Sequence, residues 1–397
     1  MRKHKSDRVI GVLTVLLLAI GLVVIYAIGP MRANFMNAAY GSDLDENYFF
    51  IHQLINVTIS IVMFVVAFKF PYEQLRKFAK IIMIVGLVAC LCLALFALVG
   101  SSLAKCELGA CRWINLGGFG SLQPAEILKL GLVLYLAQLA SVRKKEGKLE
   151  KSDFLVPAGF YSGLSLFFAV VVQKDMGTGV AIISIILGIL FVSGISMKKF
   201  VAILTVMAAA GVLAIVSSPH RMERIMTYTN GDDADNYHIE NALIAIGTGG
   251  LTGVGVGNSV QATGYLPESI NDSVFAIMGE TFGFVGLMAV VLIFAVLLSR
   301  ILGVVERGED DEHKLVASGV FSWILVQTAM NIMAMTGLIP VTGITLPLLS
   351  YGGTSMMFVA IALGIVMQLS CYTRRVKEKT SRKSFSERGG SSVRRHR

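Results

Sequence analysis

The 397-residue chain is short of charge, of proline and of cysteine. Asp, Glu, Lys and Arg make up only 15% of it, whereas soluble domains carry about 25%. Hydrophobic residues make up 55%, and forty glycines stand against eight prolines. These figures exclude a soluble multidomain protein, a disordered chain and a collagen, and five cysteines are too few for a disulfide framework. The composition therefore predicts an all-α integral membrane protein.

Long apolar runs account for most of the chain. A helix needs about 20 mostly apolar residues to cross the hydrocarbon core. Ten runs meet this requirement, at roughly 9–29, 50–69, 79–100, 124–141, 155–173, 176–195, 200–217, 274–299, 314–337 and 351–372. We therefore expect a single polytopic membrane domain over residues 1–373, with about ten transmembrane helices.

The formal net charge of +9 is placed on one side of these spans. Ten spans put both termini on the same side, and 28 of the 35 Lys and Arg residues fall in the segments on that side. The excess of Lys and Arg in cytoplasmic segments predicts that both termini are cytoplasmic. It also argues against nucleic acid as the partner of this charge. Residues 374–397 are basic and poor in apolar residues, so we expect a disordered cytoplasmic tail. Its Lys and Arg side chains could contact anionic lipid or a cytoplasmic partner. The alternative is that they only keep the C-terminus on the cytoplasmic side of the membrane.

The outer connections are longer and more polar than the cytoplasmic ones. The longest, 218–273, lies between the seventh and eighth spans and exceeds the length of a simple connector. Because Ile239–Leu251 is apolar, we interpret this loop as a lid or half-buried platform at the outer face. The glycine-dense run Gly247–Gly257 follows no predicted strand, so it indicates close backbone approach and not a dinucleotide site. The sequence has no phosphate-binding loop and no zinc-ligand spacing.

Ionisable residues gather near the outer membrane boundary. Glu126 and Lys129 are one turn apart in the fourth span, so they form either part of a site or a structural ion pair between helices. Asp175 is placed to cap the sixth span, and Glu280 lies within the eighth. Asp272, just before the eighth span, is a candidate general base, with a helix N-cap as the alternative.

Cations on the same side could bind an anionic head group such as a diphosphate. Each of them alone is more often a solvated loop residue, but their restriction to one face favours a joint role. They are Arg112, Lys129, Lys174, Arg221 and Arg224.

Motifs along nearly the whole chain resemble, in order, those of the SEDS family (shape, elongation, division and sporulation), which contains FtsW, RodA and SpoVE. The matching blocks are Arg112–Gly117 with Gln123–Lys129, Gln173–Thr178, Ala245–Gly257, Tyr265–Glu268, Asn271–Glu280 and Asn331 with Gly337–Gly353. The family's ten-span fold agrees with the count of apolar runs. The resemblance implies a peptidoglycan glycosyltransferase in the bacterial cytoplasmic membrane.

By this resemblance the enzyme polymerises lipid II and releases undecaprenyl diphosphate. Asp272 corresponds to the family's essential aspartate and would activate the acceptor hydroxyl. A divalent cation (Mg or Mn) or cationic side chains would neutralise the leaving diphosphate, and we expect no other cofactor. The residues that the resemblance and the outer-face charges assign to substrate binding are Arg112, Trp113, Gln123, Glu126, Lys129, Asp175, Arg221, Tyr265, Glu268, Glu280 and Ser350.

Other functions stay open at this stage. The basic tail and the 101–130 block favour an FtsW-like role in division over a RodA-like role in elongation. A lipid II flippase or carrier would place polar groups near the bilayer midplane, at broken helices related by an internal repeat; here the charges gather at one face, and the two halves show no repeat. A scaffold role could coexist with catalysis, because family members pair with a class B penicillin-binding protein, a transpeptidase, within the division or elongation machinery.

The chain departs from the family's motifs at a few positions. Lys174 and Thr345 replace Pro, and Ala125 replaces Ser. After Tyr237, the family's Gln, Gln and Ser are replaced by His238, Asn241 and Ala242. These substitutions put in doubt the contacts that this outer loop makes with the acceptor in the family.

Two cysteines share the outer loop before Arg112. We expect a disulfide between Cys106 and Cys111, because the outer compartment permits one, and two free thiols are the alternative.

Overall fold

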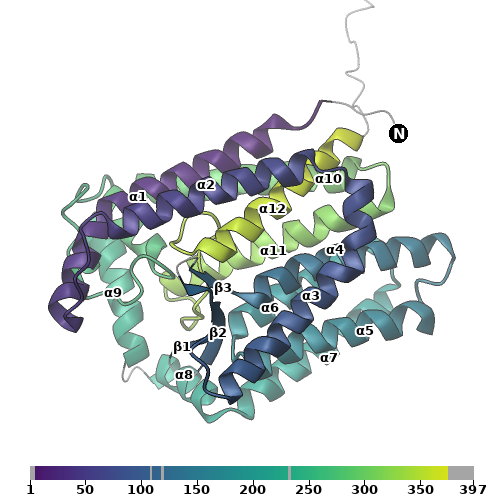
Figure 1. Cartoon of the computed structure of the whole chain (residues 1–397), viewed down its shortest axis with the longest axis horizontal. Coiled ribbons are helices and arrows are strands. Elements are labelled where there is room, and N and C mark those ends of the chain that lie inside the picture. The colour runs from purple at the N-terminus through teal and green to yellow at the C-terminus, as the bar shows by residue number, and fades with distance from the viewer. Residues whose placement is uncertain (1–4, 108–109, 118–119, 231–233, 374–397) are drawn as a thin grey trace, which may run out of the picture.

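The computed structural model describes residues 5–107, 110–117, 120–230 and 234–373 (Figure 1). Within them, ten helices are long and apolar enough to cross a membrane, which confirms the predicted fold class. In chain order the elements are α1 (Arg8–Tyr40), α2 (Tyr48–Lys69), α3 (Tyr72–Leu98), β1 (Ala104–Glu107), β2 (Ala110–Asn115), β3 (Ser121–Leu122), α4 (Pro124–Lys145), α5 (Ser152–Leu166), η2 (Phe167–Val172), α6 (Met176–Ser193), α7 (Met197–Val216), α8 (Pro219–Asn230), α9 (Ala234–Gly249), η3 (Gln261–Thr263), α10 (Val274–Arg307), α11 (Asp311–Met335), α12 (Gly353–Leu369) and η4 (Ser370–Tyr372). The predicted tail, 374–397, lies outside the described residues.

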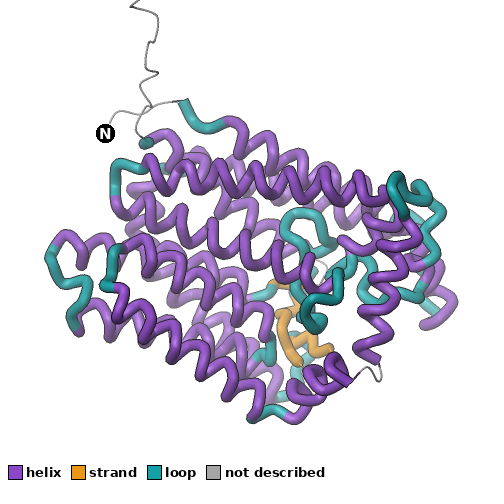
Figure 2. The backbone as a smooth tube through the Cα atoms, turned by 180° about the vertical axis from the view of Figure 1, so that it is seen from behind, coloured by secondary structure: helices purple, strands orange, loops and turns teal. Residues whose placement is uncertain are grey.

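The spanning helices run side by side, and the irregular structure gathers at one end of the bundle. Strands and long loops lie together at that end, with α8 and α9 beside them (Figures 1 and 2). The three short strands form an antiparallel sheet in the order β1-β2-β3. This end contains the predicted outer loops, so the fold collects the motif residues on one side.

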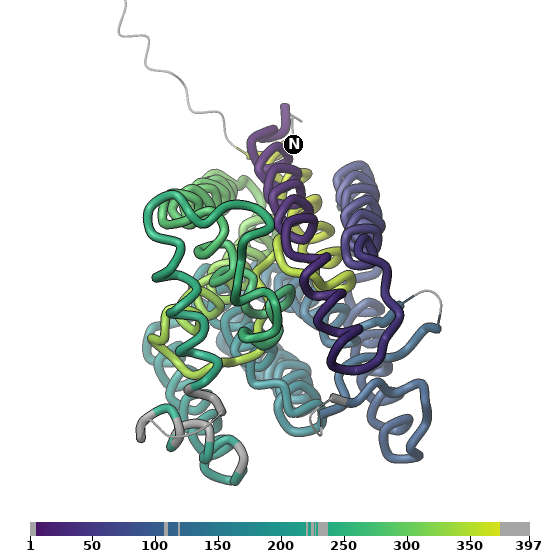
Figure 3. Tube along the Cα trace, turned by 90° about the vertical axis from the view of Figure 1, so that its left-hand side faces the viewer, coloured from purple at the N-terminus to yellow at the C-terminus, as the bar shows by residue number. Residues whose placement is uncertain are grey.

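Three helices are longer than the apolar runs predict. The first run ends at residue 29, yet α1 continues through Pro30 and stops only at Gly41, whose φ of 64° suits glycine. The start of α3 at Tyr72 and the end of α10 at Arg307 also pass the predicted limits. Hydropathy marks the part of a helix inside hydrocarbon, whereas capping residues mark where the helix ends. The extension of α1 lies beside η3, with Phe35 against Gly264 (Figure 3).

The outer segment 218–273 is partly helical and packs on the bundle. It contains α8 and α9, and α9 buries Ile239, Ala242 and Ala245. This burial confirms that the apolar part of the segment lies against the spanning helices.

The glycine run packs where α10 is broken. Gly283 has φ 68° and ψ −172°, which no helix contains. The N–H groups of Phe284 and Val285 donate to the carbonyls of Gly250 and Leu251, at 2.9 and 3.1 Å. A Cβ on Gly253 would lie 2.2 Å from the Thr281 carbonyl oxygen, so only glycine fits. The loop thus supplies the hydrogen bonds that the broken helix lacks, as non-helical backbone at membrane depth requires.

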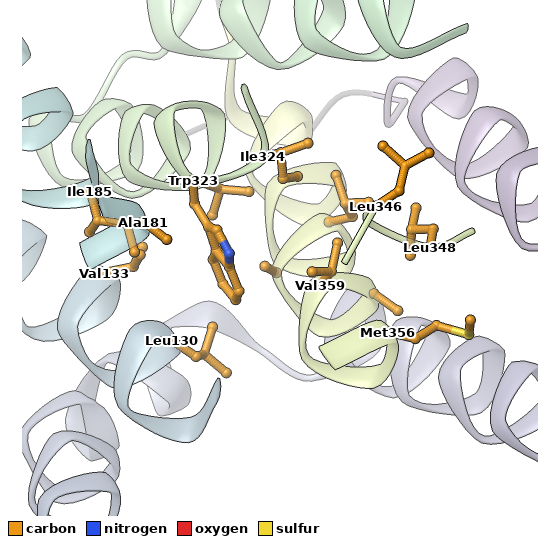
Figure 4. Close-up of a cluster of buried hydrophobic side chains, with 14 of the residues drawn as sticks. Leu130, Val133, Ala181, Ile185, Trp323, Ile324, Leu346, Leu348, Met356 and Val359 are labelled. Atoms are coloured by element: carbon orange, nitrogen blue, oxygen red, sulfur yellow. The ribbon is translucent and has the colours of Figure 1, made fainter. Parts of the chain in front are cut away.

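The core is centred on α4 and α11. Trp323 of α11 is fully buried, and its ring points toward Leu130 of α4, with Val359 of α12 to one side (Figure 4). In the most apolar 18-residue stretch of α4, 72% of the residues are buried, whereas the corresponding stretch of α7 has no buried residue. The helix that carries Glu126 and Lys129 is therefore enclosed by protein, and α7 is exposed to its surroundings.

Candidate active site

The carboxylate of Asp272 and the guanidinium of Arg112 meet at Gly343. A Cβ placed on Gly343 would lie 3.5 Å from Asp272 Oδ2 and 3.8 Å from Arg112 Nη1. These residues come from the turn before α10, from β2 and from the loop before α12. Gly343 has φ 71°, a left-handed conformation that glycine adopts at low cost. A carboxylate and a cation thus flank one small patch of backbone.

Asp272 is not the N-cap of α10. The cap position is held by Ser273, whose side chain caps no helix N–H. Ser273 Oγ instead donates to the Pro267 carbonyl at 2.8 Å and lies 2.7 Å from His238 Nε2. The N-cap alternative for Asp272 is therefore wrong, because Ser273 holds that position.

Asn331 fixes the backbone on both sides of this patch. Its side-chain amide donates to the carbonyls of Asp272 and Ile344, each at 2.7 Å. Tyr351 adds a link, since its N–H donates to the Ile270 carbonyl at 2.8 Å. The loop before α12 and the start of α10 are thus joined through α11.

Arg112 is held by a hairpin that a disulfide closes. Cys106 and Cys111 face each other across β1 and β2 and form the predicted disulfide. Arg112 Nη2 donates to the Lys174 carbonyl at 3.2 Å. Lys174 has φ 52°, which a proline ring cannot adopt. The departure from the family's proline therefore changes the backbone path at the carbonyl that receives Arg112.

The starts of α4 and α6 meet beside this hairpin. Asp175 caps α6, accepting from Thr178 N at 3.0 Å and from Thr178 Oγ1 at 2.8 Å, as predicted. Gln123 Nε2 donates to Asp175 Oδ2 at 3.4 Å. A Cβ on Gly177 would collide with Ile344, so the start of α6 packs directly on the loop that contains Gly343.

Glu126 and Lys129 form a buried ion pair within α4. Lys129 Nζ lies 2.8 Å from Glu126 Oε1 and 4.6 Å from the centre of the Trp323 ring. Glu126 Oε2 is buried without a hydrogen-bond partner. Both residues belong to α4, so the prediction of an ion pair that ties two helices together is wrong. The contact between α4 and α11 is made by Lys129 and the Trp323 ring.

Glu280 and Ser350 support loops. The Glu280 carboxylate accepts from Ser259 Oγ and from the N–H of Val260 at 2.9 Å. Ser350 Oγ accepts from Leu346 N at 2.8 Å. Both side chains are buried and engaged with the protein itself.

The remaining predicted binding residues lie in contacts of their own. Trp113 lies beside Lys105, Tyr265 is 56% exposed, and Glu268 accepts from Asn271. Arg221 donates to the carbonyls of Ala214 and Val170, and burial lowers the pKa of its guanidinium. The side chain of Arg224 lies outside the described part of the structure.

Sequence reasoning did not assign Asn331, Gly343 or His238 to the site. Asn331 and Gly343 stand in matched motifs, but their shared contact with the Asp272 region joins segments distant in sequence. His238 stands out in the sequence only as a departure from the family. Its contact with Ser273, next to Asp272, requires the folded chain.

Several buried polar atoms around the patch have hydrogen-bonding capacity to spare. Arg112 Nε, Asn331 Oδ1 and Thr342 Oγ1 have no hydrogen-bond partner among the described residues. Such atoms can bind a polar ligand, since unsatisfied buried groups are costly. In the described ranges, no group of three or more His, Cys, Asp and Glu side chains is placed to hold a metal ion, so the residues do not fit a resident metal centre.

The arrangement suits proton transfer beside an anionic group. A carboxylate can accept a proton from a hydroxyl at hydrogen-bond distance. The nearby guanidinium can bind phosphate oxygens in a bidentate manner. Lys129 provides a second, deeper cation next to an aromatic ring.

Comparisons with known proteins agree with the sequence motifs. Residues 7–375 match a family model described as "Cell cycle protein" and labelled FtsW/RodA/SpoVE. Stage V sporulation protein E of Bacillus subtilis is 33% identical, over 94% of this chain and 99% of that protein. A relative from Coxiella burnetii named "Probable peptidoglycan glycosyltransferase FtsW" is 31% identical, over 92% of this chain and 96% of its own length. A solved structure described as "Structural coordination of polymerization and crosslinking by a peptidoglycan synthase complex" has the same fold, with a TM-score of 0.69 and 21% identity, covering 92% of this chain and 97% of that one.

Proposed function

The chain belongs to the FtsW/RodA/SpoVE family, and from this premise we propose that it is a peptidoglycan glycosyltransferase that polymerises lipid II at the outer face of the bacterial cytoplasmic membrane. The observation that carries the proposal is the meeting of Asp272 and Arg112 at Gly343. It places a proton acceptor beside an anion-binding group, which is what transfer from a diphosphate-activated sugar requires.

In the proposed reaction Asp272 accepts the proton of the acceptor's GlcNAc 4-hydroxyl. That oxygen attacks the anomeric carbon of the growing, lipid-linked glycan. The new glycosidic bond forms as the bond between the anomeric carbon and the diphosphate oxygen breaks, and undecaprenyl diphosphate leaves. Arg112 binds the diphosphate as negative charge develops on it, an interaction that grows stronger toward the transition state.

Asn331, Gly343 and the disulfide hairpin position these two groups. Asn331 holds the carbonyl of Asp272, and the hairpin holds Arg112 against the Lys174 carbonyl. Lys129 is proposed to bind a more deeply inserted anionic part of a substrate, with Glu126 keeping its charge balanced. A divalent cation, if one takes part, would arrive with the diphosphate, because the described residues provide no cage for it.

The division role is favoured over elongation because relatives bear the name FtsW. By analogy with the solved synthase complex, we propose a class B penicillin-binding protein as the partner that crosslinks the product. The placement of Lys and Arg supports cytoplasmic termini and a site on the outer face.

The test is lipid II polymerisation by the purified protein, with and without a candidate transpeptidase partner. Asp272→Asn should reduce glycan formation by at least about a hundredfold, the usual contribution of a general base. The matched control is Asp45→Asn, which changes an exposed carboxylate in the connection after α1. Equal product from wild type and Asp272→Asn would remove Asp272 from the mechanism. Absence of product, together with lipid II crossing liposome bilayers, would favour a flippase.

A further inference from the structure

A second polar site lies at the opposite end of the bundle from Asp272. A cavity of about 600 Å³ lies between the segment before α1, the last turns of α10 and the chain after η4. These segments meet at the end of the molecule where α1 begins and α12 ends (Figure 1). Two links close it: the backbone N–H of Asp7 donates to the side-chain Oγ of Ser370 at 2.8 Å, and Gly308 forms a β-bridge with Thr373.

The charges in this cavity favour an anion. Among the described residues, Lys5, Arg300 and Arg307 line it, and Asp7 is the single carboxylate. Asp7 is only partly engaged with them, since its Oδ2 lies 3.9 Å from Arg300 Nη1 while its Oδ1 caps α1. The lining therefore carries a net charge of +2 from side chains that converge from two separate elements.

One face of α10 connects this cavity with lipid-exposed surface. Val285 and Leu292 are 61% and 65% exposed. The same face continues at helical spacing through Val296 to Arg300 and Arg307, which line the cavity. A ligand with hydrocarbon chains on the exposed part could therefore place its head in the cavity.

The depth of the cavity matches that of phospholipid phosphates. The part of α10 after its break at Gly283, residues 284–307, measures about 36 Å at 1.5 Å per residue, against a hydrocarbon core of about 30 Å. The apolar run of this helix ends near residue 299, so the last turns, which contain Arg300 and Arg307, extend into the head-group layer. Basic pockets between spanning helices at this level bind anionic head groups.

We propose that this cavity binds the phosphate group of an anionic phospholipid from the cytoplasmic leaflet. The cations bind the phosphate, Val296 and Val304 contact the adjoining glycerol region, and the acyl chains lie along the exposed face of α10. A free phosphate ion shares the head-group chemistry but would use only the polar part of the site. The proposal is independent of the polymerase function, because the cavity shares no residue with the Asp272 site.

The experiment is a titration of delipidated protein in detergent, with bound lipid counted by native mass spectrometry. Wild type should bind one phosphatidylglycerol at concentrations where phosphatidylcholine does not bind. The double variant Arg300→Gln/Arg307→Gln should need at least about tenfold more phosphatidylglycerol, since each cation contributes roughly a fivefold effect. The matched control, Lys77→Gln/Lys80→Gln, removes two exposed cations from α3 at the same end of the bundle and should leave the titration unchanged.

Asp7→Asn provides a test with the opposite sign. Asn preserves the helix cap and raises the net charge of the lining, so phosphatidylglycerol should bind at lower concentration. Equal binding by wild type and the double arginine variant would overturn the proposal, and so would an equal loss in the lysine control. Inorganic phosphate that binds and displaces the lipid at the same concentration would show that the occupant is a soluble anion. Unchanged thermal melting of the variants would show that any loss is local.

Discussion

Asn331 shows how a single side chain can position a reactive group without contacting the substrate. Its amide holds the carbonyls of Asp272 and Ile344, and so it sets the distance between the start of α10 and the loop that contains Gly343. Both carbonyls come from segments that no local sequence pattern brings together. The residue type is readable from the sequence, but its role depends on the tertiary structure.

Replacing Asn331 should therefore affect both stability and activity. Asn331→Leu leaves two carbonyls without their donor, and each unsatisfied buried group costs about 1–3 kcal/mol. We expect a lower melting temperature and a fall in the rate of glycan formation that exceeds the loss of folded protein. Asn258→Ala, which removes an exposed side-chain hydrogen bond to Val254, is the control and should change neither measurably. A rate that follows only the folded fraction would contradict a positioning role.

At the scale of helices and strands, some features could be predicted from the sequence and others could not. The spans were predictable because apolar length alone defines them, and the Asp175 cap and the Cys106–Cys111 disulfide were predictable because they depend on neighbours in sequence. The break at Gly283 was not, because the bonds that compensate it come from residues 250–255. The extension of α1 beyond residue 29 could not be predicted from hydropathy, because hydropathy does not detect the less apolar part of a helix.

The disulfide should influence activity through Arg112. Closing so short a loop is worth about 2 kcal/mol, and its loss would loosen the strand that directs Arg112 toward Lys174. We expect reductant to slow glycan formation by wild type, measured as the initial rate. The variant Cys106→Ser/Cys111→Ser should be slow from the start and insensitive to reductant. Equal reductant sensitivity in both proteins would assign the effect to another component.

The α3–α4 crossing depends on two glycines that allow the backbones to touch. A Cβ on Gly131 would lie 2.8 Å from Met83 Cα, and one on Gly86 would lie 2.8 Å from Leu128 Cα. Small residues permit such contacts between spanning helices.

Gly131→Ala should therefore destabilise the protein, by about 1–3 kcal/mol as for other overpacked sites. The measurement is thermal unfolding in detergent. Gly159→Ala on α5 is the matched control, because no atom lies within 4 Å of its added methyl group. If the two variants melted alike, close backbone packing would not govern this crossing.

Across the whole molecule, charge and polarity are divided between the two ends of the bundle. The motif residues, the disulfide hairpin and the long loops lie at one end (Figure 2), and most of the Lys and Arg residues that the structure describes fall in the segments of the other. The cation-lined cavity between the segment before α1 and the last turns of α10 belongs to this basic end. The asymmetry predicts orientation in the membrane, which side-chain geometry alone does not reveal.

Orientation can be measured by cysteine labelling in intact cells. In a background without native cysteines, a cysteine at Ala38 should react with an impermeant maleimide, and one at Lys198 should react only after permeabilisation. Both positions lie near helix ends, on opposite sides of the proposed membrane. Labelling of Lys198→Cys in intact cells would reverse the proposed topology and place the Asp272 site in the cytoplasm.

The pairing of Glu126 with Lys129 has a consequence for biogenesis. Glu126 and Lys129 lie in the first two turns of α4, and ionisable side chains within a spanning helix are costly to pass into lipid. Because the two residues are three apart on α4, they can neutralise each other as soon as that helix forms, before α6 and α11 have been synthesised. The helix thus carries its own counter-ion through insertion, and the later arrival of Trp323 encloses a pair that already exists.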